Sequence, residues 1–319
     1  MAGTAKGPIY AAVAANVAIA IAKFVGSFIS GSAAMLSEGI HSLVDSGNGL
    51  LLLYGINRSK IGPDEEHPMG HGKELYFWSL VVAILIFALG GGVSLFKGIE
   101  VLQHTGEHHT GDPMLNYIIL LLAMVFEGIA LFLALRSFNK ERRKSKFGFW
   151  EAIRKSKDPA RFAVIFEDSA ALLGLIVAMI GVYLTDVTGD PMYDGIASIV
   201  IGVILAVIAV ILASETKALL IGESALPSVR KGIERIVEED EEVFNAKPPI
   251  TMHFGPDDLF VALDVEFKDN LYSDEIERVV TRIENNIRKE YPIVKKIYIE
   301  AQAVSKMTKQ IPPANSNKG

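Results

Sequence analysis

Six long apolar stretches, separated by short polar connectors, make up most of the chain before residue 225. Each is long enough to cross about 30 Å of hydrocarbon, which takes around 20 helical residues. We therefore predict six transmembrane helices, with the first retained as a helix and not cleaved as a signal peptide. They fall near residues 8–30, 33–57, 75–100, 114–137, 162–185 and 193–214.

The pattern changes after residue 226 to that of a small soluble domain. Apolar positions recur at helical spacing in residues 228–239 and again after Ser273, whereas residues 259–267 alternate between apolar and polar as a half-buried strand does. Two further strands are predicted at 250–254 and 295–301. The resulting α-β-β-α-β order predicts a two-layer sandwich of helices on a sheet.

These patterns predict three regions. Residues 1–225 form the transmembrane domain and residues 226–303 form a soluble domain of about the usual size. Residues 304–319 are rich in Pro, Asn, Ser and Lys, a composition typical of a disordered tail.

Composition supports the membrane assignment and limits the chemistry. Of 319 residues, 50 % are hydrophobic, and the mean hydropathy of +0.33 is too high for an ordinary soluble domain of this length. Cysteine is absent, so any metal must be held by nitrogen and oxygen. The net charge of -6 and the acidic run at residues 238–242 argue against nucleic acid as a partner.

Basic residues are concentrated in the connectors after the second and fourth apolar stretches. By the positive-inside rule, both connectors and both termini face the cytoplasm. We expect the protein to lie in the cell (inner) membrane of a prokaryote. An organelle membrane is the alternative.

Ionisable residues inside the apolar stretches are the candidate functional groups, because they are costly in hydrocarbon. His41 and Asp45 stand four residues apart, on one face of the second stretch, and Glu38 extends that face. The fifth stretch contributes Glu167 and Asp168. One imidazole with several carboxylates suits Zn²⁺, Mn²⁺, Fe²⁺ or Co²⁺. The alternative is that these groups, with Glu127, pair among themselves or with Lys23 and Lys97 to hold helices together.

Two motifs resemble those of the cation diffusion facilitator family, in its zinc-transporter form. Residues 34–45, Ala-Met-Leu-Ser-Glu-Gly-Ile-His-Ser-Leu-Val-Asp, are similar to the family's second-helix signature with His-x-x-x-Asp. Residues 67–73, His-Pro-Met-Gly-His-Gly-Lys, resemble the segment before its third helix. The resemblance covers residues 9–301, since six spans followed by a ferredoxin-like cytoplasmic domain is also the family's plan.

This resemblance implies proton-coupled export of a divalent cation, Zn²⁺ first, by a homodimer in the lipid bilayer. The transport site would lie between the second and fifth helices and use His41, Asp45 and Asp168. The fifth helix departs from the family pattern, because Val164 stands where a ligand is usual. The fourth ligand would be Glu167 or water. Glu167 lies about 100° around the helix from Asp168, so it replaces the missing ligand only if the helix rotates or unwinds.

Two further family features map onto the connector after the second helix and the end of the sixth. Asp64 and His71 match a second, lesser metal site, although a folded turn that caps the next helix explains them equally well. Lys73 and Glu223 match a charge interlock at the dimer centre. Two independent side chains that extend to the membrane surface are the alternative there.

Enzyme classes that bury histidine and aspartate are excluded by their missing motifs. The chain contains no His-Glu-x-x-His zinc motif and no Gly-x-Ser-x-Gly nucleophile turn. We therefore predict a transporter with no enzymatic activity and no cofactor, whose metal is the cargo. An Mn²⁺ or Fe²⁺ exporter of the same family is the nearest alternative, followed by a passive cation channel or a metal-sensing membrane protein.

Overall fold

The computed structural model describes residues 6–103, 113–145, 148, 152 and 157–302. The chain divides into two compact units. One consists of Met1–Ile61 and Lys73–Leu220, and the other of Gly62–Gly72 and Ile221–Gly319. The connector at residues 62–72 therefore belongs to the C-terminal unit, and the tail predicted at 304–319 lies outside the described residues.

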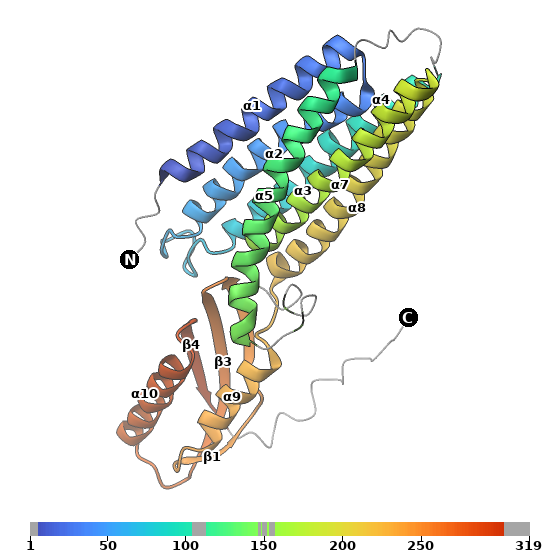
Figure 1. Ribbon diagram of the computed structural model, residues 1–319. Helices are drawn as coiled ribbons and strands as arrows, with labels where there is room; N and C mark the ends of the chain where they lie inside the picture. Colours follow the sequence, from blue (N-terminus) through green and yellow to red (C-terminus); the bar gives the residue numbers. More distant parts are fainter. Residues whose placement is uncertain (1–5, 104–112, 146–147, 149–151, 153–156, 303–319) are drawn as a thin grey trace, which may run out of the picture. The chain divides into compact units, whose positions relative to one another are not determined.

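The first unit consists of long helices that lie side by side (Figure 1). They are α1 (Lys6–Ser30), α2 (Ala33–Arg58), α3 (Glu74–Leu85), the π-helix η1 (Ile86–Gly92), α4 (Val93–Gln103), α5 (Pro113–Ser145), α7 (Pro159–Thr188) and α8 (Met192–Ile221). The segments α3, η1 and α4 follow one another as one continuous helical rod. The third predicted span is therefore unbroken, and its middle is π-helical.

Four segments of the described residues are long and apolar enough to cross a membrane: Glu74–Gln103, Met114–Lys140, Phe162–Thr188 and Met192–Ile221. Residues Asn16–Ser30 of α1 form a shorter apolar helix. Helix α2 has the length of a span, with 26 residues, but it carries the polar residues of the predicted site. The chain is thus a membrane protein with several apolar helices and a small C-terminal domain.

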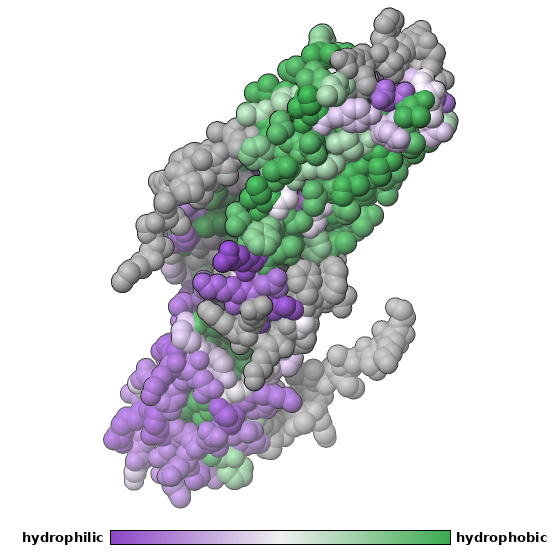
Figure 2. All heavy atoms as spheres, viewed as in Figure 1, coloured by the Kyte–Doolittle hydropathy of each residue, from purple (hydrophilic) through white to green (hydrophobic). Residues whose placement is uncertain are grey.

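Hydrophobic side chains cover much of the visible outer surface of the helical unit, whereas the C-terminal unit is hydrophilic (Figure 2). Large apolar side chains such as Phe28, Phe96 and Phe132 are exposed on the helices. Helices satisfy their own backbone hydrogen bonds, so such a surface is stable in lipid and unfavourable in water.

The start of α2 is fixed by a carboxylate from α8. Ser32 is the N-cap residue of α2, and its Oγ accepts a hydrogen bond from the Met35 backbone N–H at 3.1 Å. The same hydroxyl donates to Asp194 Oδ1 at 2.6 Å, and the backbone N–H of Ala33 also donates to the Asp194 carboxylate. Backbone donors at a helix start lack partners within the helix and favour negative charge. Asp194 therefore anchors the helix that carries His41 and Asp45.

Glycines bring α4 and η1 close to α8. A methyl group on Gly98 would lie 2.6 Å from the Gly195 carbonyl oxygen, and one on Gly202 would lie 2.9 Å from the Gly91 carbonyl oxygen. Contacts this close require residues without a side chain, a common device where helices pack in membranes. Between the two glycine contacts, the Ser198 hydroxyl donates to the Ser94 carbonyl at 2.8 Å.

The described residues of the C-terminal unit form one mixed sheet and two helices. Its elements are α9 (Pro227–Glu238), β1 (Val243–Ala246), β2 (Ile250–Gly255), β3 (Asp258–Phe267), α10 (Ser273–Glu290) and β4 (Val294–Ala301). Strand β3 is central: β4 pairs with it in parallel, while β2 and β1 pair antiparallel along its first and second halves. The helices and three strands expected from the sequence are present, and β1 is an addition.

Both helices pack on the same face of this sheet. Ile233 of α9, Ile283 of α10 and alternate residues of β3, such as Val261 and Val265, belong to one buried cluster. The strand β1 escaped prediction because its four residues, Val-Phe-Asn-Ala, are too few to show an alternating pattern, and it is held by the end of the longer β3. The result is a two-layer sandwich.

Candidate metal transport site

The second helix places its ionisable residues on one buried face. His41 is 3 % exposed and Glu38 is fully buried, while Asp45 is partly buried. Spacings of three and four residues put these side chains on adjacent turns of α2. His41 Nε2 is buried without a hydrogen-bond partner among the described residues. A buried imidazole nitrogen with no partner has its lone pair or its N–H available to a ligand.

Glu38 has a partner of its own and is not free to bind metal. The ammonium of Lys23, on α1, donates to Glu38 Oε2 at 3.0 Å and to Ser42 Oγ at 2.7 Å. Both side chains of this ion pair have zero exposure. The helix-pairing alternative raised by the sequence therefore describes Glu38, which was not among the predicted metal ligands.

Helix α7 supplies two buried carboxylates at adjacent positions. Asp168 is 9 % exposed and Glu167 is 5 % exposed. Glu167 Oε1 accepts a hydrogen bond from Asn48 Nδ2 of α2 at 2.9 Å, so Glu167 reaches α2 without any local unwinding of α7. Val164, the residue in place of a family ligand, is 40 % exposed.

Helix α5 contributes a third acidic group, Glu127, which is 6 % exposed. Its charge acts on both Asp45 and Asp168. The sequence showed a lone glutamate in the fourth apolar stretch, but it gave no indication of which neighbours it faces. Asp45 also receives a long hydrogen bond from Asn16 Nδ2 of α1, at 3.4 Å.

The transport residues lie near one another but are not drawn into a tight cluster. Among the described residues, the only group of three metal-binding side chains whose ligand atoms all lie within 4.8 Å is elsewhere, in the connector. The charge of Asp45 acts on both Glu167 and Asp168. Mutual repulsion spreads carboxylates apart, and a divalent cation between them would offset it. This arrangement can bind a cation through one nitrogen and several oxygens.

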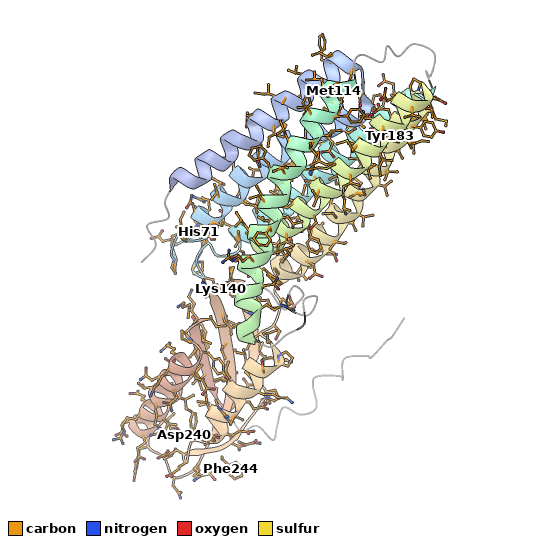
Figure 3. All side chains as sticks on the ribbon, in the orientation of Figure 1. His71, Met114, Lys140, Tyr183, Asp240 and Phe244 are labelled. Atoms are coloured by element: carbon orange, nitrogen blue, oxygen red, sulfur yellow. The ribbon has the colours of Figure 1, made fainter. Side chains whose placement is uncertain are left out.

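The tight group consists of Asp64, His67 and His71, in the connector that belongs to the C-terminal unit. Asp64 Oδ1 lies 3.3 Å from His67 Nδ1, and Asp64 Oδ2 lies 3.4 Å from His71 Nε2. The backbone N–H of His67 donates to Asp64 at 2.6 Å, and this hydrogen bond, with the two histidines, lowers the pKa of the Asp64 carboxyl. His71, labelled in Figure 3, is buried. The structure thus adds His67 to the predicted pair.

Lys73 and Glu223 fall in different units of the chain. Lys73 is the N-cap residue of α3, and the backbone carbonyl of Glu223 accepts a hydrogen bond from the His253 N–H at 3.0 Å. Their pairing across a dimer stays a prediction.

Comparison with known proteins identifies the family of the chain. The chain is 33 % identical over 241 residues to the human "Proton-coupled zinc antiporter SLC30A9, mitochondrial", which covers 75 % of this chain and 42 % of that protein. It is 29 % identical over 253 residues to "Metal tolerance protein C4" of Arabidopsis thaliana. This alignment covers 78 % of this chain and 54 % of that protein. It is 33 % identical over 117 residues to "Magnetosome protein MamM" of Paramagnetospirillum magneticum. This alignment covers 37 % of this chain and 35 % of that protein.

The chain spans less than half the length of the human relative. Its helical region, residues 9–221, matches the family described as the cation efflux transmembrane domain. The matched residues include the candidate site, from His41 on α2 to Asp168 on α7. The chain therefore belongs to the cation efflux family, whose members are transporters and not enzymes.

Proposed function

We propose that this protein exports a divalent metal cation, Zn²⁺ first, in exchange for protons. The observation that carries the proposal is the buried, unpartnered Nε2 of His41, which lies on one face of α2 with Asp45. Asp168 and Glu167 of α7 complete the ligand set. The names of the similar human antiporter and of the metal tolerance protein support the same substrate class.

Proton exchange follows from the nature of the ligands. Imidazole and carboxylate groups bind a metal only when deprotonated, so an arriving cation displaces protons and arriving protons displace the cation. One site can therefore couple the two fluxes if it opens to each side in turn. Rocking of helices about a site near the middle of the membrane is the general means of doing so.

The remaining architecture is proposed on the same basis. Six helices, α1, α2, the rod α3–α4, α5, α7 and α8, would cross the cell membrane with both termini in the cytoplasm. The C-terminal unit would be a cytoplasmic domain with a ferredoxin-like fold, as its two helices on one sheet face suggest. A homodimer with Lys73 and Glu223 at its centre would be the working form. Asp64 and His71, together with His67, would bind a second metal ion.

The carboxylate-rich ligand set favours a second candidate cargo. With one nitrogen and otherwise oxygen ligands, the site also suits Mn²⁺ or Fe²⁺, which bind oxygen readily. The mechanism would be unchanged. A panel of metals in one assay separates these cargoes.

The test is metal uptake into vesicles that contain the purified protein. Zn²⁺, Mn²⁺ and Fe²⁺ uptake is measured with and without an imposed proton gradient. We expect uptake to rise several-fold with the gradient and to be fastest for Zn²⁺. Uptake that ignores the gradient would indicate a passive channel, and the absence of uptake for every metal would contradict the transport proposal.

A further inference from the structure

Lys23 is a fully buried cation in the apolar segment Asn16–Ser30 of α1, and the metal site proposed above gives it no role. Its ammonium is held by Glu38 Oε2 at 3.0 Å and Ser42 Oγ at 2.7 Å, on the neighbouring α2. Burying two charges costs free energy that their attraction offsets only when the geometry is good. A fully buried ion pair between apolar helices of a membrane protein is by default a functional hypothesis.

The pair is oriented with its positive end toward the transport residues. Ser42 is one helical turn closer to Asp45 than Glu38 is, so a contact with Ser42 places the ammonium on the Asp45 side of Glu38. Ser42 also directly follows His41. The charge of Lys23 acts on His41, Asp45 and Glu127.

Glu38 is fixed on its other side by α7. A methyl group on Gly174 would collide with Glu38 Oε1, so this oxygen packs against the α7 backbone. Oε1 has no hydrogen-bond partner among the described residues. Glu38 thus contacts both α1 and α7. It binds the Lys23 ammonium from the side away from Asp45.

An ammonium in this position opposes the binding of a second cation. Asp45, Glu127, Glu167 and Asp168 together present up to four negative charges, which would hold a divalent ion tightly at low dielectric. A transported ion must be bound weakly enough to leave. A fixed positive charge beside the ligands weakens their hold without removing any ligand.

We propose that Lys23, fixed by Glu38 and Ser42, is a built-in cation that sets how tightly the transport site holds its divalent cargo. The proposal rests on the transport function above. Lys23 acts as a positioning residue through its charge and does not touch the metal.

Two charge variants of the full-length protein have opposite expected effects. Glu38→Gln keeps a hydrogen-bond acceptor for Lys23 but removes the opposing charge, so Zn²⁺ binding should weaken at least about fivefold. The double variant Lys23→Met with Glu38→Gln removes both charges, so Zn²⁺ binding should tighten at least about fivefold. Calorimetric titration of the purified proteins with ZnCl₂ measures both.

Transport kinetics supply a readout that a merely structural role would not move. The double variant should show a lower KM and a lower kcat, because a tighter site releases its cargo more slowly. Lys97→Met is the matched control, since Lys97 pairs with Glu100 of its own helix at 2.6 Å. It should change neither Zn²⁺ affinity nor KM.

Equal Zn²⁺ affinities in the wild type, Glu38→Gln and the double variant would overturn the proposal and leave the pair as helix-to-helix packing. If the double variant fails to insert, an unchanged Zn²⁺ affinity in Glu38→Gln alone would also overturn the proposal. Failure of the wild-type protein to bind or transport any metal would instead contradict the proposed function, so the two failures are distinguishable.

Discussion

At the scale of single residues, the site depends on groups that hold the ligands as much as on the ligands. Glu167 accepts a hydrogen bond from Asn48, and Asp45 accepts one from Asn16. Groups that orient a metal ligand often affect metal binding about as much as a ligand does. We therefore expect both asparagines to affect binding at the proposed site.

Asn48→Ala should weaken Zn²⁺ binding about tenfold, because it frees Glu167 from the orientation in which it faces α2. Asn57→Ala, an exposed position on the same helix, serves as the control and should leave binding unchanged. Calorimetric titration compares them. Equal affinities in the two variants would mean that Glu167 takes no part in holding the cation.

Sequence reasoning found the buried ionisable residues but not their partners. The spacing of His41 and Asp45 on one helix predicted a shared face, because periodicity is a local property. Which of Glu38, Glu127 and Glu167 faces the site depends on helix packing. A single sequence without contacts between helices does not contain that information.

At the scale of elements, Asp194 anchors the start of α2, the helix that carries His41. Close glycine contacts pack neighbouring helices together. The contacts Gly98 to Gly195 and Gly91 to Gly202 join α4 and η1 to α8. Apolar length predicted these spans. The π-helix between α3 and α4 was not predicted, because it arises from hydrogen bonding in a Gly-Gly-Gly segment whose composition suits several helix types.

Gly98→Ala should lower the free energy of unfolding by about 1–3 kcal/mol, because the added methyl group meets the Gly195 carbonyl and Ile199. Gly128→Ala is the control, since no atom lies within 4 Å of a methyl group there. Thermal melting in detergent micelles measures both. A Gly98 variant as stable as its control would show that α4 and α8 are free to separate.

A second element-scale prediction concerns the link between α9 and α10. Asp240, labelled in Figure 3, accepts hydrogen bonds from Arg282 Nη2 at 2.7 Å and Nε at 2.8 Å, which lower the pKa of its carboxyl. A lowered folded-state pKa gives stability that is present above the unfolded value of about 3.9 and is lost as pH falls below it.

Asp240→Asn should therefore destabilise the protein at pH 6 and have a smaller effect near pH 3. Asp269→Asn, an exposed carboxylate of the same unit, should have little effect at either pH. Chemical unfolding followed by circular dichroism at both pH values measures this. An Asp240 effect that is the same at pH 3 and pH 6 would mean that the Arg282 contact contributes no charge-dependent stability.

At the scale of the whole molecule, the proposal joins a membrane site to a soluble domain and to a second copy of the chain. Composition and apolar length predicted a membrane protein with a small sheet domain, since both are properties of long stretches of sequence. Dimer contacts depend on surfaces from two chains. For this reason the Lys73 and Glu223 interlock depends on the family resemblance alone.

A charge swap tests this interlock. Lys73→Glu and Glu223→Lys should each weaken the dimer, and the double swap should restore it, because an interfacial ion pair works in either polarity. Light scattering of the purified proteins in detergent reports the dimer fraction. A double variant as impaired as the sum of the single ones would show that the two residues do not pair.

The central claim is that a divalent cation crosses the membrane through a site shared by α2 and α7. The most direct measurement is Zn²⁺ flux into vesicles for Asp45→Ala and Asp168→Ala, with Asp186→Ala as the control at an exposed position of α7. All three proteins are first checked for insertion. We expect background flux for Asp45→Ala and Asp168→Ala and wild-type flux for Asp186→Ala. Wild-type flux in either site variant would contradict it.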